Sequence, residues 1–524
     1  MAKMSADKII VIFTVISAAL LQLIDTSIVN VSITQMMSNL GASFEEIGWV
    51  ITGYAVSNVI MITLSGWMST KFGRKYYFAG SIILFTIASV LCGMSTNVWE
   101  LVVFRVIQGI GGGGLLSTAQ AIIIETFPKE ELGFANAIFG IGVIVGPAIG
   151  PTLGGYITDN LSWQWIFFIN LPFGILATIL TFAYVKESSF RQEPSKMDWF
   201  ALAMLVAAIG CLQIVLEKGQ EEDWFESKFI LSLAIIAVGT GIIFVLRELK
   251  KQNPIVNLRL FNNRSFTTGT LFNFILGFGL YGTTLVVPVF CQSLLGFTAM
   301  QTGLIMLPGS LATGLMMPIV GSLMKRKFFH PAVYAGMGLL LFFVFSFMMS
   351  LLNTQIGSYE FFWPLIIRGI AMGLIFIPLT TISLANLEGA EIPQGTAISN
   401  MIRQLGGSIG IALITTYIST NTAKHYANLI QNVSSSNPAA TERIGMMTGA
   451  FTKGGADIGS ATSRSYALIA RSTNMQATFL TYKDIFINLG VFFLILIPLL
   501  IMFKDKKKKE LAKKEEEEVE WIIE

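Results

Sequence analysis

Charged residues, cysteines and histidines are scarce in this chain of 524 residues. Only 13% of the residues are charged and 53% are hydrophobic, whereas soluble domains carry about 25% charged residues, so an ordinary globular protein is excluded. The three cysteines (Cys92, Cys211 and Cys291) show neither metal nor disulfide spacing, and the two histidines lie at a segment edge and in a polar loop. We therefore expect no metal, no cofactor and no enzymatic site.

Motifs for binding nucleotides are absent or misplaced. No GxxxxGK[ST] pattern occurs, which argues against an ATP-driven pump. Residues 109–114 formally fit GxGxxG, but they lie inside an apolar run rather than between a strand and a helix. Close packing of helices is the better interpretation of these glycines. No nucleic-acid partner is expected.

Long apolar runs dominate what is present, and several exceed the roughly 20 residues that a helix needs to cross a bilayer. The mean hydropathy is +0.67. We expect an all-α integral membrane protein with 14 transmembrane helices. The predicted spans are 9–36, 45–69, 76–95, 98–127, 132–158, 163–185, 198–217, 228–247, 266–292, 300–324, 331–352, 361–387, 394–422 and 482–503.

The distribution of positive charge predicts the orientation of these spans. Lys and Arg number 24 on the side of the two chain ends and 8 on the other side. This bias predicts that residues 1–8 and the charged tail 504–524 are both cytoplasmic. The long polar segment 423–481 is then expected as a loop on the outer side. No cleavable signal peptide is expected.

Three pairs of segments repeat in order at offsets of 255 to 260 residues. Residues 66–75 match 321–327, residues 109–113 match 369–373, and residues 146–150 match 406–410. The repeat predicts two parallel six-helix bundles, at 9–190 and 260–503, with a two-helix insert at 198–250. Parallel halves around a central site are one plan of secondary transporters.

Several motifs resemble those of the major facilitator superfamily, in its fourteen-span drug:proton antiporter branch of the EmrB/QacA type. Residues 25–31 resemble the first-span motif of that branch, and residues 163–172 resemble its start of span 6. A gating motif follows span 2, with Gly66, Lys71, Gly73 and Arg74. The motif that the family links to export lies in span 5 and comprises Gly142, Gly146, Pro147, Gly150, Pro151, Gly154 and Gly155.

This resemblance implies proton-coupled efflux of lipophilic small molecules across the bacterial cytoplasmic (inner) membrane by alternating access. It implies protons, the lipid bilayer and a lipophilic substrate as partners, and it suggests a periplasmic adaptor and an outer-membrane channel. Thr70 departs from the pattern, because the gating motif usually has an aspartate there that helps to latch the cytoplasmic gate. Gln164 replaces a frequent arginine.

Two charges in the predicted spans suggest how coupling works. Asp25 lies about 16 residues into span 1 and Arg105 about 7 residues into span 4 from the other side, so both fall at similar depth. We hypothesise that ionised Asp25 pairs with Arg105 or with its hydrogen-bond network, and that protonation breaks the pairing. The alternative is a static ion pair that only holds two helices together.

Other polar residues in the spans are candidates for the substrate cavity. Charges inside a membrane are costly and usually face a cavity, which predicts such a position for Arg368 and Arg403. A headgroup contact explains Arg403 equally well. The cavity candidates are Asn30, Tyr54, Gln108, Arg368 and Arg403. An excess of buried cations favours anionic or neutral lipophilic substrates.

Competing interpretations remain at this level. An exporter of a specific lipid, fatty acid or metabolite would use the same mechanism. A channel would carry a filter loop or a ring of charges, and none is visible. Segment 423–481 is interpreted as a lid, as a docking surface for an adaptor, or as a mobile linker.

Overall fold

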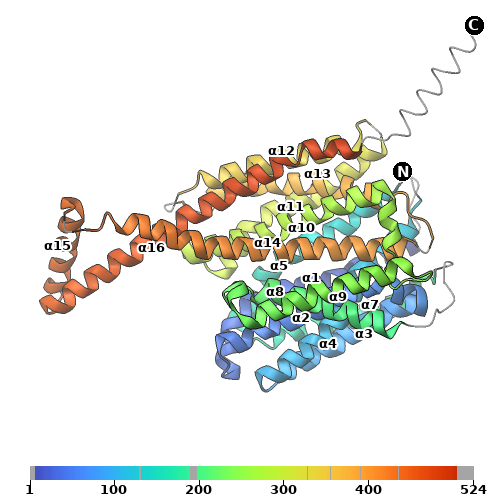
Figure 1. Ribbon diagram of the computed structural model, residues 1–524, viewed down its shortest axis with the longest axis horizontal. Coiled ribbons are helices and arrows are strands. Elements are labelled where there is room, and N and C mark those ends of the chain that lie inside the picture. The colour runs from blue at the N-terminus through green and yellow to red at the C-terminus, as the bar shows by residue number, and fades with distance from the viewer. Residues whose placement is uncertain are drawn as a thin grey trace, which may run out of the picture.

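The computed structural model describes residues 6–128, 131–188, 198–326, 328–353, 356–389, 391–434 and 436–503. The predictions for the charged tail 504–524 and for residues 1–5 lie outside this part of the chain. Every regular element in the described ranges is helical. The helices run roughly along one long axis, with the first and last described residues at one end and helix α15 (Pro438–Lys453) at the other (Figure 1). We call these the terminal end and the distal end.

The first group of helices corresponds to predicted spans 1 to 6. It comprises α1 (Ala6–Leu40), α2 (Phe44–Phe72), α3 (Arg74–Met94), α4 (Val98–Thr126), α5 (Leu132–Asn160), α6 (Trp165–Phe168) and α7 (Asn170–Tyr184). Local sequence sets the boundaries. Ser43 and Glu46 form a capping box at the start of α2, and the Asn97 side chain caps α4. Gly73, with φ of 89°, separates α2 from α3.

The remaining helices cover predicted spans 7 to 14. They are α8 (Trp199–Lys218), α9 (Lys228–Lys250), α10 (Arg264–Val289), the π-helix η4 (Phe290–Leu294), α11 (Ala299–Lys325), α12 (Pro331–Ser350), α13 (Phe362–Leu384), α14 (Glu391–Ile430), α15 (Pro438–Lys453) and α16 (Ile458–Ile495). Short 3-10 helices are η2 (Trp224–Glu226), η3 (Leu258–Asn262), η5 (Tyr359–Phe361) and η6 (Pro498–Phe503).

Fourteen helical segments of the described chain correspond to the fourteen predicted spans. Twelve of them are long and apolar enough to cross a membrane by length and composition alone. The other two are α5 and α14, whose 29 and 40 residues correspond to about 44 and 60 Å at 1.5 Å per residue. Both exceed the roughly 30 Å of a bilayer's hydrocarbon core. The protein is an all-α integral membrane protein.

Segment 423–481 differs from the loop that hydropathy suggested. It is formed by the end of α14, by α15 and by the first half of α16, and it projects beyond the other helices at the distal end (Figure 1). The Asn437 side chain caps α15, which has Pro438 in its first turn, and the Asp457 side chain caps α16. Hydropathy detects apolar stretches only, so polar helices outside the bilayer escape it.

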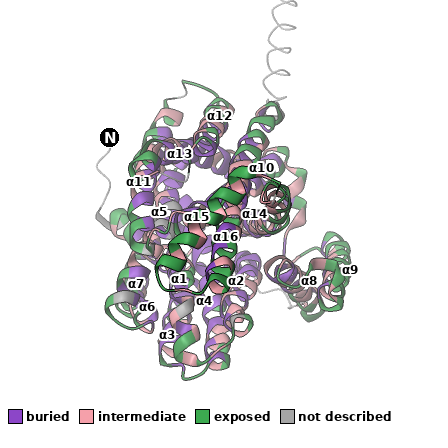
Figure 2. Ribbon diagram, turned by 90° about the vertical axis from the view of Figure 1, so that its left-hand side faces the viewer, coloured by how far each residue is buried: buried purple, intermediate pink, exposed green. Residues whose placement is uncertain are grey.

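Two groups, each covering six predicted spans, pack side by side, and α8 and α9 lie against their flank (Figure 2). Within the first group α1 packs on α5, and α4 packs on both α2 and α3; within the second α10 packs on α14, and α13 packs on α11 and α12. The groups meet where α5 contacts α11 and where α14 contacts α2 and α4. The insert, α8 and α9, touches α2 and α14 and thus spans both groups. The arrangement is the predicted pair of bundles with a two-helix insert.

Candidate functional site

The Asp25 carboxylate on α1 lies at the centre of a buried polar cluster in the first bundle. Its side chain is fully buried, and Arg105 on α4 is only 1% exposed. The Arg105 Nη1 atom donates to Asp25 Oδ2 at 2.5 Å and also to Gln108 Oε1 at 2.7 Å. The two residues are 80 positions apart in sequence, and the packing of α1, α2 and α4 brings them together.

Neutral amides complete the coordination of this carboxylate. Gln108 Nε2 donates to Asp25 Oδ1 at 2.9 Å, and Asn170 Nδ2 donates to the same oxygen at 3.1 Å. Both amides also donate to the Ser89 hydroxyl, which itself donates to the Phe167 carbonyl oxygen at 2.9 Å. Four helices, α1, α3, α4 and α7, therefore contribute polar side chains to one site.

The guanidinium of Arg105 is held on its other sides by backbone and aromatic groups. Its Nε atom donates to the Val50 carbonyl oxygen at 3.4 Å. Its Cζ atom lies 4.0 Å from the centroid of the Tyr54 ring and 5.8 Å from that of Phe167. These contacts are of the cation–π type, which strengthens when the cation is desolvated. Predicted cavity residues Tyr54 and Gln108 thus belong to the same cluster as the predicted pair.

The chemistry available at this cluster is proton exchange on one carboxylate. Ionised Asp25 accepts from a cation and two amides, which together balance and solvate its charge without water. Adding a proton removes the negative charge and leaves Arg105 as an unbalanced cation in a buried environment. Such a change is costly unless the helices rearrange, so the protonation state and the packing of α1 against α4 are linked.

Glycines of the span-5 motif allow α5 to approach α1 closely beside Asp25. A Cβ atom on Gly150 would overlap the Ser27 hydroxyl, and one on Gly146 would lie 2.8 Å from Leu23 Cβ. A Cβ on Gly154 would come within 3.0 Å of the Ile28 backbone oxygen. The motif therefore sets the position of the helix that carries the carboxylate.

The other motif members contribute less to this contact. A Cβ on Gly142 would meet Ile16 at 3.4 Å, an ordinary contact distance. Gly155 is buried, and Pro151 lies within α5 with a partly buried side chain. The side chain of Pro147 lies outside the described part of the structure.

The gating motif lies at the terminal end. Two acidic residues that the sequence did not identify, Glu125 and Glu187, lie beside it. Arg74 forms an ion pair with Glu125 at the end of α4, and the Arg74 backbone N–H donates to Glu187 Oε1 at 2.7 Å. The Glu187 carboxylate also lies against Gly73, where a Cβ atom would come within 2.7 Å of it. Thr70, at the position of the usual aspartate, donates to the Trp67 carbonyl oxygen instead.

The other two residues of the gating motif make one contact within α2 and one with α14. Lys71 lies 4.4 Å above the Trp67 ring. Gly66 lies where α2 crosses α14, and a Cβ atom there would come within 2.8 Å of the Pro393 backbone oxygen. This glycine permits close contact of the two bundles at the terminal end.

The remaining cavity candidates lie outside the Asp25 cluster. Arg368 on α13 is 9% exposed and donates to the Thr283 and Thr284 hydroxyls of α10 at 3.0 and 3.2 Å. Arg403 on α14 donates to Asn400 Oδ1 at 2.5 Å and lies 5.5 Å from the Phe376 ring centroid. Asn30 is exposed, five residues beyond Asp25 on α1.

Ser89 and Asn170 are the members of the Asp25 cluster that sequence reasoning did not single out. A lone serine or asparagine in an apolar span is a weak signal, because either side chain can also bond within its own helix. Asn170 stands directly before Leu171 and Pro172, at the break between α6 and α7. A polar residue at a helix break is the feature of the sequence that could have identified Asn170 as a site residue.

Comparisons with known proteins agree with this architecture. The family model described as Major Facilitator Superfamily matches residues 15–411. The multidrug export protein EmrB of Escherichia coli strain K12 is 34% identical over 501 residues, which cover 94% of each chain. The fatty acid resistance protein FarB of Neisseria gonorrhoeae is 30% identical over 491 residues, or 93% of this chain and 94% of that one.

A solved structure supports the fold. The human organic anion transporter MFSD10 superposes with a TM-score of 0.54 at 14% identity, over 94% of this chain and 100% of the other. At that identity the likeness concerns the fold alone. Together with the family match over residues 15–411 and the extended similarity to EmrB, it shows that the chain belongs to the major facilitator superfamily, in the branch of the EmrB-type proteins.

Proposed function

We propose that this protein exports lipophilic small molecules, in the manner of a multidrug efflux transporter, by exchanging them for protons. The observation that carries the proposal is the fully buried Asp25 carboxylate, held by Arg105, Gln108 and Asn170 from two other helices. A buried carboxylate and its paired cation have no net charge together. Binding of a proton to the carboxylate leaves the pair with a net positive charge. The similarity to a protein named for multidrug export supports the choice of substrate class.

Asp25 is the proposed proton carrier, and Arg105 is its partner. Gln108 and Asn170 position the carboxylate, because each amide reaches it from a different helix. Protonation releases Arg105 and weakens the contact between α1 and α4, which favours the alternate arrangement of the bundles. Gly66, Gly73 and Arg74 act at the terminal end, where the two bundles touch.

We further propose that the terminal end is cytoplasmic and that the membrane is the bacterial inner membrane. The excess of lysine and arginine on that side supports this orientation. The projecting hairpin of α14, α15 and α16 then lies in the periplasm. Its exposed apolar residues, such as Met446, Ile458 and Tyr466, fit contact with a periplasmic adaptor that leads to an outer-membrane channel.

The test uses the purified full-length protein in sealed liposomes with an imposed pH gradient and a panel of cationic, neutral and anionic lipophiles. We expect gradient-driven transport with the native protein and none with Asp25→Asn, which keeps the shape of the side chain. The matched control is Asp223→Asn, an exposed acid in the loop after α8, which should transport normally. Unchanged gradient-driven transport by Asp25→Asn refutes the assignment of the proton carrier.

A second candidate is export of a fatty acid or another anionic metabolite by the same mechanism. Two observations favour it: the similarity to FarB, and the Arg368 guanidinium, which contacts threonine hydroxyls rather than a carboxylate within the described residues. A buried cation so placed can bind a carboxylate headgroup. Transport of a fatty acid with exclusion of cationic dyes in the same vesicles would select this candidate.

A further inference from the structure

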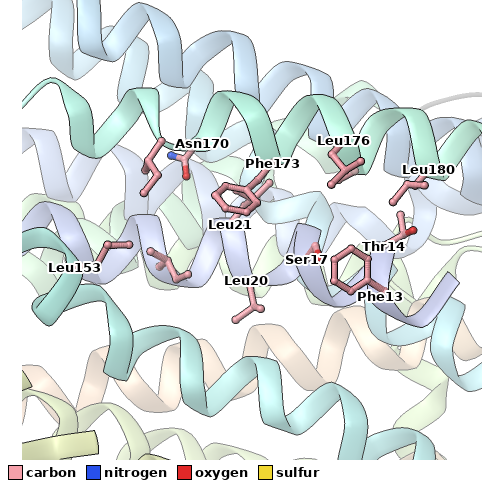
Figure 3. A pocket seen from close by; sticks show the side chains of 13 residues that line it. Phe13, Thr14, Ser17, Leu20, Leu21, Leu153, Asn170, Phe173, Leu176 and Leu180 are labelled. Carbon is pink, nitrogen blue, oxygen red and sulfur yellow. The ribbon is translucent and has the colours of Figure 1, made fainter. Parts of the chain in front are cut away.

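A groove on the outer surface of the first bundle leads to the Asp25 cluster. It lies between α1 and α7, with α5 at its inner end, and has a volume of about 460 Å³ (Figure 3). Small-molecule sites typically fall between about 300 and 1,000 Å³. The side chains that shape it are those of Phe13, Leu21, Leu153, Phe173, Leu176 and Leu180.

This groove opens sideways, toward the lipid. Phe13, Phe173 and Leu176 along its rim are 55%, 52% and 46% exposed at the surface of the bundle. The lining extends from residue 13 to residue 24 on α1, a rise of about 16 Å. Half of a 30 Å hydrocarbon core is about 15 Å, so the groove is about as long as one acyl chain.

Asn170 supplies a polar group at one end of the groove, and Thr14 and Ser17 add hydroxyls toward the other end, where Thr14 donates to the Ile10 carbonyl oxygen of its own helix. The Asn170 side chain is 2% exposed, and its amide nitrogen donates to both Asp25 Oδ1 and the Ser89 hydroxyl. Its amide oxygen accepts no hydrogen bond from the described residues, and Figure 3 shows it directed toward the groove. A ligand in the groove can donate to this oxygen, and such a hydrogen bond contributes about 0.5–1.5 kcal/mol net.

The chemistry of this end selects the headgroup. The free position is an acceptor, so the ligand must donate a hydrogen bond. A carboxylate has no donor and would meet the Asn170 oxygen with the Asp25 carboxylate behind it. An ammonium group donates, but moving a full charge from water into the groove costs far more than moving a neutral hydroxyl or amide.

We propose that the groove is a lateral binding site for a single-chain amphiphile with a neutral, hydrogen-bond-donating headgroup. The chain lies between α1 and α7, and the headgroup donates to the Asn170 oxygen. This inference rests on the proposed function, since it gives a membrane-dissolved substrate a route to a residue that contacts the proton carrier directly.

The binding test uses the full chain in lipid nanodiscs and a dodecanol analogue that carries a photoreactive diazirine on its chain. We expect covalent labelling, located by mass spectrometry, within residues 13–24 and 173–180. Unlabelled dodecanol should compete, whereas butanol (too short) and dodecyltrimethylammonium (no donor) should not. Labelling spread over all lipid-facing helices, without competition by dodecanol, identifies bulk lipid contact only and overturns the proposal.

A pair of variants tests the site itself. Leu176→Trp fills the groove from its rim, whereas Ile179→Trp adds the same side chain to α7 outside the lining, at a position that is 59% exposed. We expect Leu176→Trp to lower site labelling about tenfold, which equals roughly 1.4 kcal/mol, and Ile179→Trp to leave it unchanged. Equal labelling of both variants overturns the groove assignment.

Transport separates this proposal from the proposed function. Native protein that moves no solute under a pH gradient contradicts the proposed function, whatever the labelling shows. Gradient-driven transport by native protein, combined with no competed labelling in the groove, leaves the proposed function standing and removes the lateral site.

Discussion

The Asn400 amide on α14 donates to the Gln120 side-chain oxygen on α4 at 2.9 Å, across the boundary between the two bundles. Gln120 in turn donates to Asn136 on α5 at 3.4 Å, and Asn136 donates to Thr381 on α13 at 3.3 Å. Asn400 lies about 14 Å along α14 from its start at the terminal end. These hydrogen bonds join the bundles near that end.

Replacing Gln120 by methionine should weaken this closure. The change keeps the side-chain length and removes the hydrogen bonds to Asn400 and Asn136, which contribute about 1–3 kcal/mol together. We expect a larger population with a longer distance between spin labels on Tyr76→Cys and Phe329→Cys, measured by double electron–electron resonance. Both label sites are exposed at the terminal end, in different bundles.

The control for this measurement is Gln35→Met, which removes a hydrogen bond to the Thr158 carbonyl oxygen within the first bundle. It should leave the label distances unchanged. Cys211, whose side chain is only partly buried, is replaced by alanine in all labelled proteins. Identical distance distributions for Gln120→Met and native protein would show that these amides do not hold the bundles together.

Asp25 and Arg105 should be energetically coupled. Removing one member of a buried ion pair costs about 3–5 kcal/mol, because the other charge is left buried without a partner. We expect Arg105→Gln alone to lower the unfolding temperature in detergent more than the double variant Asp25→Asn/Arg105→Gln does. Strictly additive effects of the two substitutions would contradict a direct charge pair.

The span-5 glycines should differ in their tolerance of a methyl group. Gly150→Ala forces a Cβ atom into Ser27 and should push α1 away from α5, at a cost of about 1–3 kcal/mol for overpacking. Gly142→Ala, with its nearest neighbour at 3.4 Å, should fold and transport normally. Thermal unfolding and gradient-driven transport measure both variants. Equal behaviour would mean that close contact of α1 and α5 is dispensable.

The pH dependence of transport should not arise from the Glu131–Lys325 pair. This exposed pair joins the residue directly before α5 to the end of α11 at 2.7 Å, and the hydrogen bond from Lys325 lowers the pKa of Glu131. A carboxyl with a lowered pKa contributes its stabilisation above its ordinary pKa of about 4.3 and loses it only as the pH falls through the lowered value.

The stabilisation from the Glu131–Lys325 pair is therefore the same at every pH between 6 and 8. We expect Glu131→Gln to leave the pH profile of transport unchanged over this range, while Asp25→Asn abolishes gradient-driven transport. A shifted profile for Glu131→Gln, measured with the same vesicles, would assign part of the coupling to this exposed pair.

Long apolar segments were predictable from the sequence, and the Asp25–Arg105 contact followed from matching depths along two spans. The first inference uses hydropathy, and the second combines the helical rise and the cost of charge in lipid with the family resemblance, which implies that spans 1 and 4 line one cavity. The structural contact does not by itself establish proton coupling, which stays a prediction. Arg368 was predicted from the same cost, but its partners Thr283 and Thr284 were not, because threonine is common in apolar spans.

What the sequence left open were contacts between groups distant along the chain. Ser89 and Asn170 join the cluster through the packing of α3 and α7, which no local pattern reveals. Glu125 and Glu187 surround Arg74 although neither lies in the gating motif. The helices beyond residue 423 were missed for a different reason, since their polar surface lies outside the region that hydropathy detects.

α14 continues as one helix from Glu391 to Ile430, so Asn400 and the projecting hairpin belong to a single rod. Thirty residues separate Asn400 from Ile430, a length of about 45 Å. A tilt of this rod by about 10° about Asn400 displaces its far tip by about 8 Å, since the rise is 1.5 Å per residue. Opening or closing near one face of the membrane is thereby amplified into a swing of the hairpin on the opposite face, which a fluorophore on α15 would report in real time.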